Sequence, residues 1–150
     1  MDDLFYMKEA YQVAVKAFEN NETPVGCVIV HDGIIIGRGA NNRITQKSVL
    51  YHAEIIAIGQ ACAVMNDWRL EQCRLYVTIE PCPMCAGAII QARIPVVVYG
   101  ASNPKAGCAG SVLNILNEPR FKHQAQIITG IMQEECAGLM TRFFKRFRSN

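Results

Sequence analysis

Apolar residues recur at spacings of three and four along residues 3–19, which is the pattern of an amphipathic helix. The members of this stripe are Leu4, Met7, Tyr11, Ala14 and Phe18. A second stripe at helical spacing covers residues 53–65, and further helices are predicted over residues 86–92 and 134–148. Helical segments are therefore expected along the whole chain.

Short apolar runs rich in β-branched residues separate these helices and predict strands. The runs cover residues 25–30, 34–36, 75–79, 96–99 and 126–129. Asp32-Gly33, between the first two runs, is typical of a tight hairpin. Strands that alternate with helices after an initial hairpin predict an α/β fold with a mixed five-stranded sheet and helices on both faces. The length predicts a single domain, 1–150.

Polar and glycine-rich segments between these elements predict loops. Gly37 and Gly39 are expected to end the second strand and to lead into a polar loop. Residues 100–107 are a loop by composition. Ser111 is expected to cap a short helix that runs to Leu116.

Composition restricts the class of protein further. Apolar residues make up 51% of the 150 residues, which excludes a disordered chain. No apolar run approaches the roughly 18 residues that a membrane span needs. The acidic start has no apolar run after it, and the chain has seven cysteines, so we expect a cytoplasmic protein without a membrane partner. Five thiols are then expected to be core or unused: Cys27, Cys62, Cys73, Cys108 and Cys136.

Two cysteines stand at the start of a predicted helix. A strand-like run stops at Pro81, and Cys82 and Cys85 follow three residues apart. The free N–H groups at a helix start favour thiolate over thiol, so both sulfurs can serve one spot as anions. Such a pair is either a metal clamp or a redox pair, and the C-x-x-C spacing alone does not decide between them.

A histidine and a glutamate upstream favour the metal. A catalytic zinc takes three protein ligands and keeps one position for water, and His52, Cys82 and Cys85 make such a set. Glu54 is then a carboxylate beside the metal, suited to proton transfer. Residues two apart on a helix do not face each other, so His52 must lie at or before the first turn. A structural zinc site, a redox pair and a packed polar histidine are the plainer interpretations.

The order H-x-E and then P-C-x-x-C is the signature of zinc deaminases. Beyond it, the chain resembles the bacterial tRNA-specific adenosine deaminases, within the cytidine deaminase-like superfamily. The discriminating motifs are residues 68–70, 75–82, 101–107, Gly110-Ser111 and the pair Phe143-Phe144. The resemblance covers nearly the whole chain. It implies a three-layer α/β/α fold, one zinc ion per chain, a homodimer, and conversion of the wobble adenosine in a tRNA anticodon loop to inosine.

The resemblance also assigns substrate contacts. Asn41 resembles the family's substrate-contacting Asn after the second strand, and Val25 resembles an apolar wall residue against the base. Asn103 stands where the family often has Asp, in the loop near the nucleotide sugar. Because a neutral amide both donates and accepts, we expect weaker discrimination of RNA from DNA. Tyr51 departs from the family's usual residue before the His, and it either lines the pocket mouth or packs.

Basic residues near the C-terminal end suggest contacts with an RNA backbone. Arg142, Lys145 and Arg146 lie three and four residues apart on the last predicted helix, which suits phosphates. Lys105, in the loop of residues 100–107, is assigned to the same contacts. A solvated helix end is the plainer interpretation, because cations there also suit the helix dipole.

The expected reaction is hydrolytic: zinc-bound hydroxide attacks C6 of adenine, and Glu54 transfers the protons. Two other functions fit many of the same residues. One is a zinc deaminase of a free base or nucleoside, of the guanine or cytidine type. The other is a zinc-stapled RNA-binding protein without turnover. Glu54 argues against the latter, because a structural zinc site does not need an unliganded carboxylate.

Overall fold

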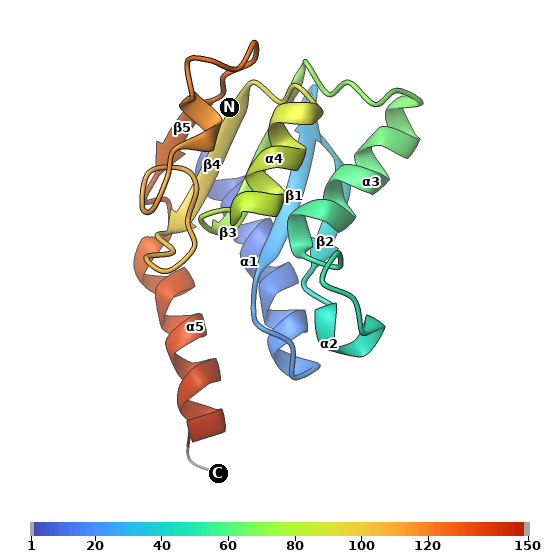
Figure 1. Cartoon of the computed structure of the whole chain (residues 1–150). Helices are drawn as coiled ribbons and strands as arrows, with labels where there is room; N and C mark the ends of the chain where they lie inside the picture. The colour runs from blue at the N-terminus through green and yellow to red at the C-terminus, as the bar shows by residue number, and fades with distance from the viewer. Residues whose placement is uncertain (1, 149–150) are drawn as a thin grey trace.

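The computed structural model describes residues 2–148 (Figure 1). Residue 1 and residues 149–150 of the predicted domain therefore lie outside the described residues. The helices are α1 (Asp3–Glu19), α2 (Arg43–Gln46), α3 (Ala53–Met65), α4 (Pro83–Gln91), η1 (Ile115–Asn117, a 3₁₀ turn) and α5 (Gln133–Arg148). The strands are β1 (Gly26–His31), β2 (Ile34–Ala40), β3 (Cys73–Ile79), β4 (Val96–Ala101) and β5 (Gln126–Thr129).

The five strands of the described chain form one mixed sheet in the order β2-β1-β3-β4-β5. The initial hairpin makes β1 antiparallel to β2, and β1 is also antiparallel to β3. From β3 onward the neighbours β4 and β5 are parallel, because α4 and the segment after β4 return the chain to the same end. The predicted α/β fold with a mixed five-stranded sheet is confirmed.

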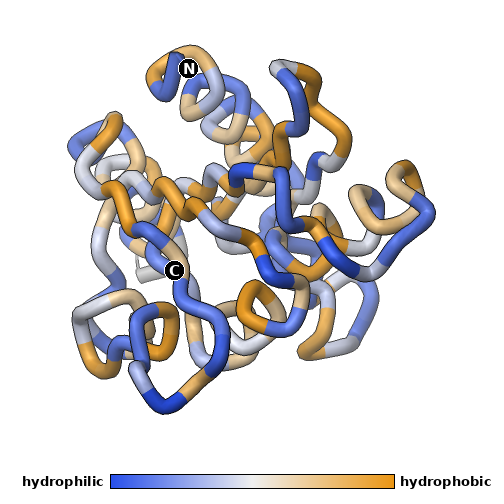
Figure 2. Tube along the Cα trace, turned by 90° about the horizontal axis from the view of Figure 1, so that it is seen from above, coloured by the Kyte–Doolittle hydropathy of each residue, from blue (hydrophilic) through white to orange (hydrophobic). Residues whose placement is uncertain are grey.

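Helices cover both faces of the sheet (Figure 1). Along β1, Cys27 and Ile29 join the core beneath α3 and α4, whereas Val28 and Val30 join the core beneath α1 and α5. This alternation follows from the two-residue period of a strand, and every one of these β1 side chains is buried. Figure 2 shows the hydropathy of the residues along the trace, with hydrophobic and hydrophilic stretches following one another.

Strand β2 is longer than the sequence predicts, and its glycines explain the difference. It continues through Gly37 and Gly39 to Ala40, so the prediction that these glycines end the strand was wrong. Helix α3 lies so close to β2 that a Cβ on Gly39 would be 2.1 Å from the Ala53 carbonyl oxygen. The glycines therefore permit the close approach of a helix to a strand and leave the strand intact.

Two short segments also differ from the prediction. Helix α2 forms inside the predicted polar loop. Ser111 does not begin a helix: the only helical turn near it within the described residues is η1, and the Ser111 hydroxyl donates to Glu80 instead. The predicted helix after the C-x-x-C begins earlier, at Pro83, which suits the first helical position because the missing N–H has no partner there.

The contact between Gly39 and α3 generates a test. Gly39→Ala should push α3 away from β2, because overpacking of this kind costs roughly 1–3 kcal/mol of unfolding free energy. The matched control is Gly138→Ala on α5, whose Cβ would meet only Arg142 Nη1 at 3.6 Å. That variant should be neutral or more stable by about 0.5–1 kcal/mol. Chemical denaturation measures both, and equal midpoints would contradict the packing argument.

Candidate active site

Two helices begin at the same end of the sheet and define the site. His52 is the residue immediately before α3, in an extended conformation (φ −78°, ψ 154°), and Cys82 is the residue immediately before α4. The prediction that His52 precedes the first turn of its helix is therefore confirmed. Each helix start carries a partial positive charge, so the two together favour anionic ligands and thiolates at this place.

In the described chain, His52, Cys82 and Cys85 form the group of side chains that could hold a metal ion, which we call the metal-ligating cluster. His52 Nδ1 lies 3.6 Å from the sulfur of Cys82 and 3.6 Å from that of Cys85. Tetrahedral zinc with ordinary Zn–S and Zn–N bond lengths places a nitrogen and a sulfur ligand about 3.6 Å apart. The donor set and its spacing therefore fit a tetrahedral metal that keeps its fourth position for a non-protein ligand.

The thiols of Cys82 and Cys85 differ in pKa. The pKa of Cys82 is lowered to about 5, first by the hydrogen bond from the Cys85 thiol, and also by the Cys85 and Met84 amides and by His52; burial opposes these effects. The pKa of Cys85 is raised by that same hydrogen bond, by burial and by the charge of Glu54. Cys82, at the start of α4, is thus the thiol that loses its proton at the lower pH.

Glu54 lies behind the cluster with only 4% of its surface exposed. Burial raises the pKa of this carboxyl to about 7, and the negative charge of Cys82 contributes in the same direction. The Glu54 backbone N–H and the Cys85 thiol act against this shift. A carboxyl group with a pKa near neutrality can both take up and release a proton at physiological pH.

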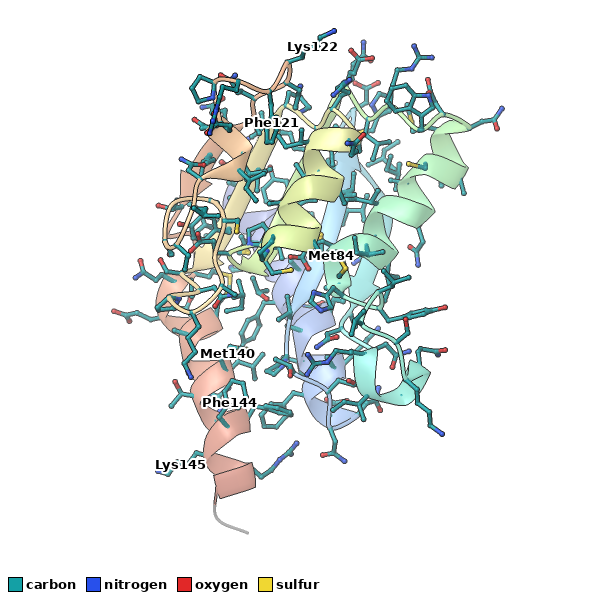
Figure 3. All side chains as sticks on the ribbon, viewed as in Figure 1. Met84, Phe121, Lys122, Met140, Phe144 and Lys145 are labelled. Carbon is teal, nitrogen blue, oxygen red and sulfur yellow. The ribbon has the colours of Figure 1, made fainter. Side chains whose placement is uncertain are left out.

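A cavity of about 510 Å³ opens onto these residues. Its floor includes His52, Glu54 and Cys82. The remaining wall comes from four regions: Thr23 and Val25; Asn41 and Arg43; Ile79 and Glu80 with Ala101 to Lys105; and Ala137, Met140 and Phe144 of α5. Figure 3 places Met140 and Phe144 one helical turn apart on α5. The cavity is therefore apolar on the α5 side and polar on the loop side.

Three of the four predicted substrate contacts line this cavity: Val25, Asn41 and Asn103. The Asn41 amide donates to the Thr23 carbonyl oxygen at 3.2 Å and accepts from the Arg43 N–H at 3.2 Å. Asn103 Oδ1 accepts from the Ala106 N–H at 3.3 Å, so its side chain stabilises the turn after it. Tyr51 is 41% exposed and lies outside the lining formed by the described residues.

The predicted RNA-backbone residues occupy three different settings. Lys105 is exposed at the cavity rim, and Arg142 and Lys145 are exposed on α5. Arg146 is directed at the end of α1, where its guanidinium lies 4.4 Å from the Phe18 ring centroid. It also donates to the Phe18 carbonyl oxygen and to Asn21 Oδ1. Arg146 thus helps to join α5 to α1.

Among the residues that line the cavity, sequence reasoning did not assign Arg43, Met140 or Phe144 to the site. Arg43 follows Asn41 by two residues, and this spacing in a polar loop was the available signal. Met140 and Phe144 are four apart on α5 and so share a face, which the helical period could have indicated. The sequence did not indicate that this face meets the metal-ligating cluster, because the contact is made across the fold.

The other cysteines are free thiols: Cys27, Cys73, Cys108 and Cys136 are buried, and Cys62 is partly buried. This agrees with the prediction of core or unused thiols. No helix in the described part of the chain combines the length and the apolar character that crossing a membrane requires.

The chain is similar to curated proteins over almost its full length. It is 49% identical over 146 residues to the tRNA-specific adenosine deaminase of Bacillus subtilis (strain 168), covering 97% of this chain and 91% of that protein. It is 44% identical over 144 residues to that of Rickettsia bellii (strain RML369-C), covering 95% and 99%. The family profile of the MafB19-like deaminases matches residues 1–148.

Solved structures give the same likeness. A structure from a study of A-to-I editing by tRNA:A34 deaminases at the wobble position of transfer RNA matches with a TM-score of 0.86 at 38% identity, covering 90% of this chain and 98% of that chain. A guanine deaminase from Nitrosomonas europaea matches with a TM-score of 0.79 at 19% identity, covering 91% and 81%. At that identity the second likeness concerns the fold alone.

Proposed function

The chain belongs to the MafB19-like deaminases and, among them, to the tRNA-specific adenosine deaminases, and we propose that it hydrolyses the wobble adenosine of a tRNA anticodon loop to inosine. The observation that carries this proposal is the cluster of His52, Cys82 and Cys85 with buried Glu54 at the floor of one cavity. A buried carboxyl with a pKa near 7 beside three metal ligands suits catalysis. An RNA-binding protein without catalytic turnover would not need such a carboxyl group.

The relatives also weigh against a deaminase of free guanine or cytidine. The curated relatives at 44–49% identity carry the name tRNA-specific adenosine deaminase. The guanine deaminase shares only 19% identity. An apolar wall from α5 and a rim with Lys105 and Arg43 suit a nucleotide that is still part of a strand.

Zinc is the metal that we propose for the cluster. Two thiolates and one imidazole, with a fourth position left for water, are a typical catalytic zinc set. When bound by His52, Cys82 and Cys85, the ion would lower the pKa of a water toward about 7 and so supply a nucleophile at neutral pH. The second ring nitrogen of His52 is left for a partner that orients the imidazole.

Glu54 moves the protons in this proposal. Its carboxylate takes one proton from the attacking water and gives it to the ring nitrogen beside C6 of adenine. It then assists proton transfer to the amino group, which leaves as ammonia, and the carbonyl of inosine is formed. Burial favours this role, because it raises the pKa of the carboxyl to about 7, where the group can both accept and donate a proton near neutral pH.

The target base must leave its stack to reach a recessed metal. This costs little in a single-stranded anticodon loop, whose bases are already available for stacking on protein side chains. We propose that Val25 packs against the base and that Asn41 and Asn103 contact the nucleotide. The expectation that Asn103 discriminates RNA from DNA less sharply than an Asp stays a prediction. For Tyr51 we propose contact with the RNA outside the cavity, because its ring is exposed.

We also propose a homodimer and a cytoplasmic location. Helices α3 and α4 are apolar almost all round, and their only ionisable side chain outside the cysteines is buried Glu54. A helix without a polar face is normally buried. Gly59 and Gly87 have no atom within 4 Å of where a Cβ would stand, so they leave room for a second copy. The seven free thiols suit a reducing compartment.

The function is tested by incubating the protein with an anticodon stem-loop that carries adenosine at the wobble position, and separately with free bases and nucleosides. Inosine and ammonia should form in equal amounts from the stem-loop. Glu54→Gln should retain metal and RNA binding but lose turnover by about 10⁴-fold or more, because one carboxyl serves several proton transfers. If Glu54→Gln retains turnover within about tenfold of the parent, another group moves the protons. Turnover of guanine alone would replace the proposed substrate.

Cys82→Ala should release the zinc, because two ligands rarely retain a catalytic metal. The matched control is Cys108→Ala, which removes a buried thiol that is near enough to Cys82 to interact with its charge but lies outside the three-ligand set. Elemental analysis should give one zinc per chain for the parent and for Cys108→Ala, and little for Cys82→Ala. Full zinc content in Cys82→Ala would exclude this ligand assignment.

Two exposed cations on α5 should govern the salt dependence of RNA binding. Arg142→Gln/Lys145→Gln should lower the log–log salt slope by roughly 0.7 for each phosphate that the protein no longer neutralises. The control is Arg120→Gln/Lys122→Gln, which removes the same charge at the other end of the molecule, where Figure 3 shows Lys122. Arg146 is kept out of the pair because its guanidinium contacts α1. If both double variants have the same salt slope, Arg142 and Lys145 do not contact the RNA backbone and this part of α5 is ordinary solvated surface.

The homodimer can be tested by one charge in the proposed interface. A Cβ at Gly87 would have no atom within 4 Å, so a monomer should tolerate Gly87→Glu, whereas a dimer across α3 and α4 should dissociate. Gln12→Glu is the control, because it adds the same charge at an exposed position of α1. Sedimentation equilibrium gives the mass of each variant. A parent that sediments as a monomer, or a dimeric Gly87→Glu, would refute the interface.

A further inference from the structure

Two loops form the polar side of the cavity, and each is attached to a buried glutamate that the mechanism does not use. One loop carries Asn41 and Arg43, and the other carries Asn103 and Lys105. The two attached carboxylates belong to Glu22, in the turn after α1, and Glu80, directly after β3. Each is only 1% exposed. Neither belongs to the metal-ligating cluster.

Glu80 accepts four hydrogen bonds from the second loop. Its Oε1 accepts from the Asn103 N–H at 3.1 Å and from the Ser111 hydroxyl. Its Oε2 accepts from the Ala109 N–H at 2.9 Å and the Ser111 N–H at 3.0 Å. The loop packs directly onto the carboxylate, since a Cβ on Gly107 would lie 2.4 Å from Glu80 Cδ. The backbone of residues 103–111 is therefore wrapped around one anion.

Glu22 does the same for the first loop. Its Oε1 accepts from the Ile44 N–H at 3.0 Å, and its Oε2 accepts from the Thr45 N–H and the Thr45 hydroxyl, both at 2.7 Å. These groups belong to α2, which begins at Arg43, two residues after Asn41. The Asn41 side chain then joins Thr23 to Arg43 through its own two hydrogen bonds. This loop too is fixed by one buried anion.

Burial of a carboxylate costs free energy of folding unless hydrogen-bond donors surround it. The donors around Glu22 and Glu80 have one feature in common. The hydrogen bonds described above all run to these two carboxylates from loops that flank the cavity. Loops normally lose conformational freedom when a ligand binds, and prior ordering lowers that cost. Fixing the loops before binding should therefore raise the affinity for the substrate. The chemical step depends on other residues: His52, Cys82, Cys85 and Glu54.

We propose that Glu22 and Glu80 are positioning residues that hold the two loops in the conformation that receives the nucleotide and its neighbours. The inference rests on the proposed function for its kinetic consequences. The anchoring itself can be measured without substrate. Neither glutamate touches the reacting atoms in this scheme.

Glu→Gln substitutions test the proposal because they keep the size of the side chain and exchange one acceptor for a donor. In Glu80→Gln the new NH₂ is best placed at Oε1, because the Ser111 hydroxyl can rotate to accept, whereas Oε2 faces two N–H groups. The Asn103 N–H then loses its acceptor. In Glu22→Gln the NH₂ must face the N–H of either Ile44 or Thr45.

The first readout is amide hydrogen exchange, followed residue by residue by NMR in zinc-loaded protein without RNA. Glu80→Gln should accelerate exchange at Asn103 roughly tenfold or more, with no change at Ile44 and Thr45. Glu22→Gln should do the reverse, so each variant is the control for the other. Uniform acceleration in either variant would indicate global destabilisation and would overturn the anchoring.

The second readout separates positioning from a merely structural role. In both variants KM for the stem-loop should rise roughly tenfold, while kcat for the zinc-loaded protein stays within about threefold of the parent. An equal fall of kcat with unchanged KM would overturn the proposal. If exchange changes locally but KM stays the same, the glutamates anchor the loops without any effect on substrate binding. That result would also overturn the proposal. A parent that does not deaminate the stem-loop refutes the proposed function instead, and the exchange result still stands.

Milder variants cover the case in which a glutamine variant does not fold. Ser111→Ala and Thr45→Val each delete one hydroxyl donor and retain the carboxylate with its N–H donors. Each should reproduce the exchange and KM effects in its own loop to a smaller extent. Wild-type exchange and KM in both would overturn the proposal.

Discussion

The close approach of α3 to β2 is the constraint on which the site depends. Only glycine at positions 37 and 39 lets the helix backbone lie against the strand, with the Ala53 carbonyl oxygen almost where a Cβ of Gly39 would be. That contact fixes where α3 begins, and therefore where His52 and Glu54 stand. The start of α4 is fixed independently by the end of β3 and by Pro81, which cannot continue the strand. Three ligand atoms within 4.8 Å of one another result from these two placements.

Among the described residues, Glu54 and Glu80 line the cavity and Glu22 holds one of its loops, and hydrogen-bond donors decide what each buried carboxyl can do. Burial alone would raise the pKa of all three carboxyls. For Glu22 and Glu80 the donors, above all the hydroxyls of Thr45 and Ser111, outweigh burial and hold the pKa below its ordinary value. For Glu54 burial prevails and the pKa rises to about 7. The first two therefore stay charged and suit anchoring, whereas Glu54 can exchange a proton.

The sequence predicts the elements well because their signals are local. The helical stripe of residues 3–19, the Asp32-Gly33 hairpin and the run of residues 126–129 each report on neighbours in the chain, and each appears in the structure. The ligand set was also accessible, since helix starts and the H-x-E and C-x-x-C spacings are local. Gly39 was misjudged because its role is to admit a helix from elsewhere. Ser111 was misjudged because its partner, Glu80, lies 31 residues away in the chain.

The residues proposed for the chemical step and those proposed for recognition of the nucleic acid are positioned in different ways. The ligands and Glu54 stand at the starts of α3 and α4, which pack on the same face of the sheet against one core, so their geometry can be rigid. The groups that we propose to meet the rest of the nucleic acid belong to two loops at the cavity and to α5. The two loops are tethered by the carboxylates of Glu22 and Glu80. Helix α5 is held by its buried residues and by the contact of Arg146 with Phe18. Substitutions at the tethers should therefore affect the binding of the nucleic-acid strand more than the rate at which the base is deaminated.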